Sequence, residues 1–187
     1  VEPHAQRAVV WCVVSATALF AGGLADGPFP EHYEPMESPV ANLMNRQKVN
    51  PASVILPSVV GEFGDSGRFP YAATTFRLVE HWQAGAMTRN LPWLNELVPD
   101  MFCEISPELA AKKGIKNGDR VKVRSQRGEI EVYALVTGRV KAYDLNGKKV
   151  ELVALPWHFG PGGAAGGAIA NRLTPHIGDA NTMIPEY

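Results

Sequence analysis

Side chains that could take part in ligand chemistry gather at two places in the sequence. Arg77, His81 and Trp82 lie close together, and Trp157-His158 repeats the pairing of an aromatic residue with a histidine. An arginine fork, an imidazole and an indole N–H would make a polar wall for an anionic, heteroaromatic ligand. Taken singly, an Arg or a His is weak evidence for a site, and spacing alone favours Arg77 as a surface ion-pair former and His81 as a hydrogen-bonded residue at a strand end. Both interpretations stay open.

Glycine dominates residues 160–167, which contain a formal G-x-G-x-x-A match. A dinucleotide fingerprint requires a tight strand-to-helix turn inside a βαβ unit. Here residues 156–159, Pro-Trp-His-Phe, separate the expected strand from the glycines, and the pattern predicts no second parallel strand. Two interpretations remain, a surface loop or a loop whose backbone closes over a bulky ligand, because glycine permits close approach of the main chain.

The chain has two cysteines, Cys12 and Cys103, whose spacing matches no metal or redox motif. The chain alone therefore cannot ligate an iron–sulfur cluster or build a cysteine-rich zinc site. Cys103 follows Phe102 on an expected core strand, which makes it a poor candidate for a metal thiolate. No carboxylate pair and no Ser-His-Asp order stands out, so we predict no catalytic and no metal-ligating residue in the chain.

The elements that would position these residues are mostly strands. Alternating and β-branched patterns predict five strands, at residues 75–82, 102–105, 120–125, 129–137 and 150–155. Ser106 as N-cap, Pro107 at the first helical position and Gly114 after the end predict a two-turn helix between the second and third strands. This order favours a small barrel over a βαβ sheet.

The N-terminal third of the sequence is different in character. Residues 8–25 carry no charge, which is typical of a signal-peptide core or a marginal membrane span, although an internal or mis-joined segment is the alternative. Six prolines between residues 27 and 57 predict an extended arm, with at most a helical turn near 40–47. Residues 54–75 are expected to be loop-like.

Composition describes a globular chain without a basic surface. The 187 residues include 18 Lys or Arg and 19 Asp or Glu, for a net charge of −1, and 45% are hydrophobic. Nucleic-acid binders show a basic excess or stripe, so we expect no nucleic-acid partner.

Four segments, taken in order, resemble one known family: 26–39, 74–90, 103–137 and 170–187. The first two read DGPFPEHYEPMESP and TTFRLVEHWQAGAMTRN, and the four in this order are far more specific than any one alone. They resemble the C-terminal part of the catalytic (alpha) subunit of molybdenum or tungsten formate dehydrogenases, which belong to the molybdopterin oxidoreductases that bind two molybdopterin guanine dinucleotides. The likeness covers about residues 22–187.

The resemblance implies a mainly β fold with short helices. A double-psi six-stranded β-barrel, the molybdopterin-dinucleotide-binding domain, would occupy residues 71–187 and lack its C-terminal end. An extended Pro-rich arm, residues 26–70, and an apolar segment of uncertain status, residues 1–25, would precede it. Motif matching implies that the following residues bind the cofactor: Thr75, Arg77, Leu78, Glu80, His81, Trp82, Thr88 and Asn171. We further expect Arg77 and His81 to contribute to binding and not to folding.

The implied function is the cofactor-binding portion of a formate dehydrogenase that oxidises formate to carbon dioxide in anaerobic respiration. The portion would not be catalytic alone, since the family's metal-ligating selenocysteine or cysteine and its iron–sulfur cysteines lie in earlier domains. Its partners would be the remainder of the catalytic subunit and an iron–sulfur electron-transfer subunit, in the periplasm or alternatively the cytoplasm. Two alternatives stay open, a free-standing barrel subunit docked on a separate catalytic chain and a nitrate-reductase-like relative. The sequence does not distinguish molybdenum from tungsten or identify the electron acceptor.

Overall fold

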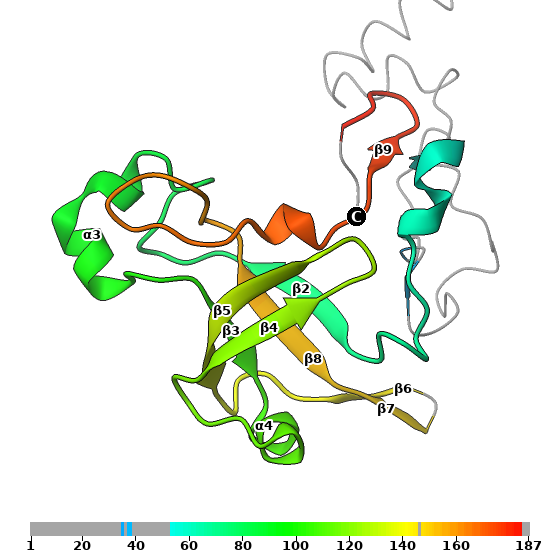
Figure 1. Ribbon diagram of the computed structural model, residues 1–187, viewed down its shortest axis with the longest axis horizontal. Coiled ribbons are helices and arrows are strands. Elements are labelled where there is room, and N and C mark those ends of the chain that lie inside the picture. Colours follow the sequence, from blue (N-terminus) through cyan, green and yellow to red (C-terminus); the bar gives the residue numbers. More distant parts are fainter. Residues whose placement is uncertain (1–34, 36, 39–52, 146, 185–187) are drawn as a thin grey trace, which may run out of the picture. The chain divides into compact units, whose positions relative to one another are not determined.

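The computed structural model describes residues 35, 37–38, 53–145 and 147–184 (Figure 1). The apolar segment 1–25, most of the predicted arm and the helical turn expected near 40–47 lie outside the described residues. The described residues belong to two compact units: residues 37–38 and 61–175 form the larger, and 35, 53–60 and 176–184 the smaller.

The larger unit is built on a five-stranded mixed sheet. Its strand order is β2-β8-β3-β5-β4, with β2 parallel to β8, β3 parallel to β5, and the other neighbours antiparallel. Their bounds are β2 Ala72–Phe76, β3 Phe102–Ile105, β4 Arg120–Arg124, β5 Glu129–Val136 and β8 Leu152–Pro156. The described chain is therefore mainly β with a few short helices, as predicted.

The predicted hairpin is confirmed in β4 and β5. Strand β5 alternates exposed and buried residues, so Ile130, Val132 and Ala134 enter the core while Glu131 and Tyr133 between them face solvent. On the outer face, Lys122 Nζ lies 3.0 Å from Glu129 and 3.5 Å from Glu131. The period-two alternation therefore predicts which side chains of this hairpin face the core and which face solvent.

The predicted helix is α4, Pro107–Lys113. The Ser106 hydroxyl accepts a hydrogen bond from the backbone N–H of Leu109 at 3.0 Å, and Gly114 ends the helix in a left-handed conformation with φ 68°. Both capping groups satisfy backbone atoms that the helix itself leaves without partners. Leu109 and Ala110 then pack into the core beside Cys103 and Ile105.

Two expectations about strand positions were wrong. The first strand ends at Phe76 and does not run through 75–82, because the backbone N–H of Leu78 donates to a histidine ring, His158 Nε2, at 2.8 Å. The stretch expected to be loop-like contains β1 Ser53–Ile55, the 3-10 helix η2 Pro57–Glu62 and most of β2. Strand β1 pairs with β9, more than a hundred residues later, and local patterns do not carry that information.

The smaller unit contains this antiparallel pair, β1 with β9 Ile177–Asp179. The chain then turns on Asp179, whose Oδ1 accepts from the backbone N–H groups of Asn181 at 3.0 Å and Thr182 at 2.7 Å and from the Thr182 hydroxyl at 2.8 Å. These bonds, those from Thr182 first, lower the pKa of Asp179 because they stabilise the carboxylate.

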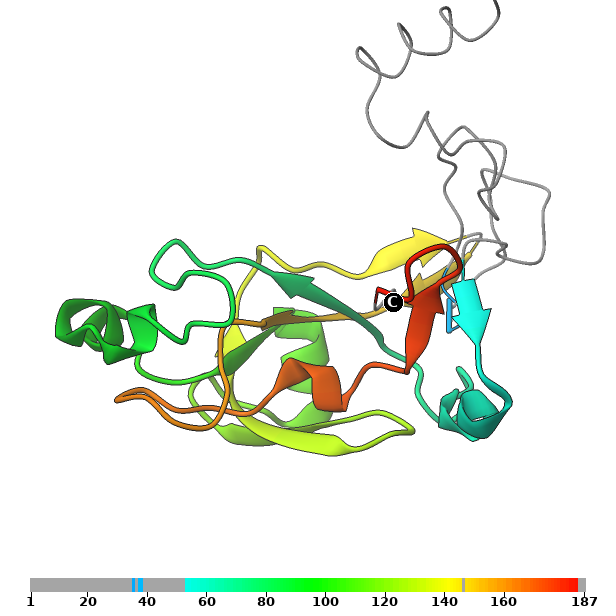
Figure 2. The ribbon, with the colours of Figure 1, turned by 90° about the horizontal axis from the view of Figure 1, so that it is seen from above.

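Short elements complete the larger unit: η3 Thr88–Asn90, α3 Pro92–Leu97, β6 Tyr143–Leu145, β7 Lys148–Val150 and η4 Ala170–Arg172. The green segment around α3 and the orange segment 160–169 lie at the same end of this unit in both ribbon views (Figures 1 and 2). Among the described helices, none has the length and apolar character needed to cross a membrane.

Candidate functional site

The segment that leaves β2 carries six of the eight predicted site residues. Thr75 precedes it and is an exposed residue of β2, and Asn171 lies in η4, which packs against β5. Within the segment, Arg77 is exposed, Leu78 and Glu80 are half-buried, and Trp82 keeps 61% of its surface exposed. An exposed guanidinium and an exposed indole can both contact a planar anionic ligand.

His81, Trp82 and Thr88 are joined through one hydroxyl group. The backbone N–H of Trp82 donates to Thr88 Oγ1 at 3.1 Å, and His81 Nδ1 lies 3.3 Å from the same oxygen. His81 Nε2 donates to the carbonyl oxygen of Val98 at 3.0 Å, so the network assigns the Nε2–H tautomer and lets Nδ1 accept from the hydroxyl. These bonds bring together three residues that the sequence predicted to share a site.

His81 is also part of the local fold. Its side chain is buried, both ring nitrogens are engaged within the chain, and the ring meets Phe159 edge-on with centroids 5.3 Å apart. The expectation that His81 contributes to binding and not to folding is therefore wrong in its second half, because losing the buried ring would remove its hydrogen bonds to the half-buried Thr88 and Val98.

His158 fixes both ends of the loop that carries His81 and Trp82. The ring is 1% exposed; Nε2 accepts from the backbone N–H of Leu78 at 2.8 Å, and Nδ1 donates to the carbonyl oxygen of Gln83 at 2.5 Å. The sequence had indicated His158 only as one half of a repeated Trp-His pair.

Arg89 is a site residue that sequence reasoning missed. Its side chain is 6% exposed, and Nη1 donates to the carbonyl oxygens of Gly160 at 3.1 Å and Ala165 at 3.0 Å, and also to that of Gly162. The backbone carbonyl of Arg89 in turn accepts from Ala164 and Ala165. The glycines of 160–167 are therefore wrapped around a buried guanidinium, an arrangement that no spacing rule in the sequence indicated.

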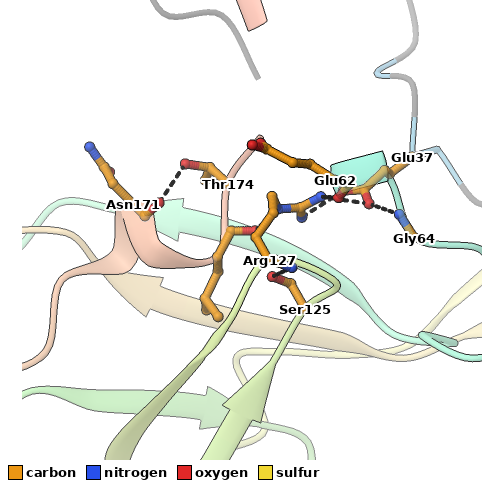
Figure 3. A network of polar contacts seen from close by, with 8 residues as sticks. Glu37, Glu62, Gly64, Ser125, Arg127, Asn171 and Thr174 are labelled. Carbon is orange, nitrogen blue, oxygen red and sulfur yellow. Dashed lines mark hydrogen bonds and ion pairs between the residues drawn. The ribbon is translucent and has the colours of Figure 1, made fainter. Parts of the chain in front are cut away.

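A second arginine joins distant segments near Asn171 (Figure 3). Arg127, at the β4–β5 turn, pairs with both carboxylate oxygens of Glu37 at 2.8 Å and donates to the carbonyl oxygens of Glu62 at 2.6 Å and Leu173 at 2.7 Å. Since Leu173 directly follows η4, these bonds hold the end of the helix that carries Asn171.

Two further buried ionisable groups lie on β3. Burial raises the pKa of the Cys103 thiol to about 11, so the thiol is protonated at neutral pH. The buried carboxylate of Glu104 is paired with Arg139, whose Nε lies 3.0 Å from Glu104 Oε2. In the described part of the chain, no three His, Cys, Asp or Glu side chains gather in a way that could hold a metal ion.

Comparison with known proteins decides the family. Residues 71–187 match the model of the Molydopterin dinucleotide binding domain, more than half of the chain. The chain belongs to this family of molybdopterin dinucleotide binding domains. The match includes β2, the segment after it, both loops held by His158 and Arg89, and η4.

Several curated relatives are formate dehydrogenase subunits. The chain is 46% identical over 170 residues to formate dehydrogenase subunit alpha of Megalodesulfovibrio gigas, and 47% identical over 177 residues to the nitrate-inducible formate dehydrogenase major subunit of Escherichia coli. Each alignment covers 90% of the chain and 17% of the relative, so the chain spans about a sixth of the length of these proteins. Among solved structures, acetylene hydratase from Pelobacter acetylenicus aligns over 74% of this chain and 16% of its own, with TM-score 0.46 and 15% identity.

Proposed function

We propose that this chain binds molybdopterin guanine dinucleotide with the segment 75–88 and η4, as part of a formate dehydrogenase. The observation that carries the proposal is the loop after β2. It presents Arg77 and Trp82 to solvent while His81 and Thr88 hold its backbone in place. A fixed backbone with exposed polar and aromatic groups suits a rigid ligand with phosphates and a dense edge of donors and acceptors.

The residues present fit such a dinucleotide. Arg77 supplies a guanidinium for a phosphate, Trp82 an exposed indole face, and Asn171 an exposed amide with both donor and acceptor atoms. Leu78, Glu80, His81 and Thr88 would border the cofactor mainly through the shape of the loop, since His81 and Thr88 already bond within the chain. When bound, the cofactor carries the metal on which the redox chemistry occurs; this chain's part is to bind it and exclude water.

The whole enzyme would oxidise formate to carbon dioxide, and this chain would be its cofactor-binding portion without activity by itself. The support is the identity to alpha and major subunits of formate dehydrogenases over nearly the whole chain. Its partners would be the remainder of the catalytic subunit and an iron–sulfur electron-transfer subunit. A periplasmic location, the choice of molybdenum or tungsten, and the division at residues 25 and 70 stay predictions.

The finer fold that we propose is the six-stranded double-psi barrel preceded by a Pro-rich arm. Among the described residues, β2 and β4 are the edges of the sheet, each with one neighbour. Both edges line the same cavity of about 530 Å³, and Ile105, Val121 and Val153 contribute apolar surface to it. One more strand between these edges, from a segment that the structure does not describe or from another chain, would close the barrel and leave no edge exposed.

A reconstitution experiment tests the proposed function. The full chain is incubated with molybdopterin guanine dinucleotide, washed by gel filtration, and hydrolysed so that GMP release measures retained cofactor. We expect retention that Arg77→Ala reduces and that Arg124→Ala, at another exposed arginine, leaves unchanged. No retention by the unaltered folded chain would contradict the proposal. Retention of the cofactor without formate-dependent dye reduction would support the proposal that this chain binds the cofactor but is not catalytic alone.

A further inference from the structure

Two segments of the larger unit each hold the other's backbone. The first, residues 77–90, contains the proposed cofactor loop, and the second, residues 157–167, contains the glycine-rich loop. In each segment a buried polar side chain, Arg89 in the first and His158 in the second, makes hydrogen bonds to the main chain of the opposite segment. The two sets of bonds are thus reciprocal.

His158 acts on the first segment. The backbone N–H of Leu78 can only donate, so His158 Nε2 must accept, and the ring is the neutral Nδ1–H tautomer that donates to the carbonyl oxygen of Gln83. These two contacts enclose residues 79–82. Gln83 itself has a φ of 51°, a left-handed conformation that costs energy for a side chain with a β-carbon. The bond from His158 stabilises the loop at the residue where it is strained.

Arg89 acts on the second segment. Three carbonyl oxygens converge on its Nη1, and among the described residues its guanidinium makes no ion pair with a carboxylate. Its Nε is also buried and has no hydrogen-bond partner in the described part of the chain. A buried cation whose side-chain hydrogen bonds all go to main-chain carbonyls requires the loop that supplies them to keep one conformation. Gly163 adopts φ 83°, and a β-carbon there would lie 3.2 Å from Arg89 Nη1, which explains why glycine stands at this position.

The two sets of bonds meet at Gly85. A β-carbon on Gly85 would lie 2.1 Å from the carbonyl oxygen of His158 and 2.8 Å from Arg89 Nε. The main chain of the first segment therefore touches both buried residues at one point. Because this packing leaves no space, a shift of the Arg89 side chain or of the His158 main chain would be transmitted to the backbone of the first segment at Gly85.

We propose that Arg89 and His158 are positioning residues that form a reciprocal brace, which holds the two segments as one rigid wall for the dinucleotide. The role toward the cofactor rests on the proposed function, whereas the brace itself does not. Rigid loops lose little conformational freedom when a ligand binds, and the brace would therefore slow dissociation of the cofactor without any contact between the two side chains and the ligand.

Amide hydrogen exchange measured by mass spectrometry on the full chain tests the brace. Arg89→Met keeps the length of the stem and His158→Phe keeps a ring. Each removes the side-chain hydrogen bonds to the opposite segment, while the backbone bonds between Arg89 and residues 164–165 stay available. We expect either variant to speed exchange roughly tenfold in both 77–90 and 157–167, in line with the loss of buried hydrogen bonds, while β3 and β5 keep their protection. Arg124→Met, at an exposed arginine, should change neither segment.

Faster exchange in only one of the two segments, 77–90 or 157–167, would overturn the reciprocal brace. If Arg89→Met also exposes β3 and β5, Arg89→Lys decides, because an ammonium can still donate to the same carbonyl oxygens. Partial protection of both segments in Arg89→Lys is then expected, and protection lost in only one of them would contradict the brace.

Cofactor retention distinguishes the brace itself from its proposed role in holding the cofactor. The retained cofactor is measured after increasing washing times as the GMP released on hydrolysis. We expect Arg89→Met and His158→Phe chains to lose cofactor roughly tenfold faster than the unaltered chain, because the buried hydrogen bonds that hold the loops are lost. Coupled exchange with unchanged retention would overturn the role toward the cofactor. Failure of the unaltered chain to retain any dinucleotide would overturn the proposed function, whereas coupled exchange would still support the brace.

Discussion

The main chain of Gly85 lies directly against that of His158, so that a β-carbon on Gly85 would come within 2.1 Å of the His158 carbonyl oxygen. Gly85 also has a φ of 76°, in the left-handed region. Glycine is thus required at position 85 both by space and by conformation. A residue with a β-carbon there would prevent the two loops of the candidate site from approaching this closely.

The first prediction follows from this contact. Gly85→Ala should lower the free energy of unfolding by more than the roughly 1–2 kcal/mol that a left-handed residue with a β-carbon costs, because a steric clash adds to the strain. Gly118→Ala is the matched control, since Gly118 has φ 86° but no atom within 4 Å of the added carbon. Urea unfolding of both variants measures the difference. If the free energy of unfolding decreases equally in both variants, the close approach to His158 does not add to the cost of Gly85→Ala.

The second prediction concerns Arg127 and Glu37, whose side chains are 10% and 28% exposed. Glu37→Gln should destabilise the larger unit by about 1–3 kcal/mol, since a largely buried guanidinium loses its charged partner. Lys122→Ala breaks ion pairs whose side chains are about half exposed, and it should change stability far less than Glu37→Gln because solvent screens these charges. Similar values for the two variants, from the same unfolding measurement, would mean that the network in Figure 3 is no stronger than a surface pair.

The third prediction is a pH dependence that arises from Cys103. Burial raises the pKa of its thiol to about 11, whereas an unfolded cysteine titrates near 8.5. A raised pKa stabilises the fold fully below the unfolded value, and this contribution is lost as the pH rises from about 8.5 towards 11. The free energy of unfolding should therefore fall less steeply with pH above 8.5 in Cys103→Ala than in the unaltered chain.

Thiol labelling gives an independent measurement of the same burial. In a Cys12→Ser background, iodoacetamide at pH 8 should label Cys103 far more slowly in the folded chain than in urea, because the thiolate is the nucleophile. Rapid labelling of the folded chain would contradict the raised pKa.

Local patterns in the sequence predicted what depends on neighbouring residues. The α4 helix was predicted from its caps at Ser106 and Gly114, and the β4–β5 hairpin from alternation, since both signals act within a few residues. The sequence could not predict where β2 ends, because Leu78 leaves the strand to bond His158, eighty residues later. Arg89 was missed for the same reason, as only the fold brings the glycine-rich loop around it.

Of the predicted site, the structure joins His81, Trp82 and Thr88 by hydrogen bonds and leaves Arg77 exposed at the end of β2. Whether these residues bind the dinucleotide stays a prediction. Arg77 offers the cleanest test, because its exposure separates a role in binding from a role in folding.

That test is the cofactor affinity of Arg77→Ala, measured together with the thermal unfolding of the cofactor-free chain. Loss of a charge-assisted hydrogen bond worth roughly 1.5–3 kcal/mol should weaken binding of molybdopterin guanine dinucleotide by roughly ten- to a hundredfold, while the melting temperature stays nearly unchanged. Arg124→Ala should alter neither quantity. If instead Arg77→Ala lowers the melting temperature of the cofactor-free chain and leaves cofactor content per folded molecule normal, Arg77 serves the fold and the proposed binding site is wrong.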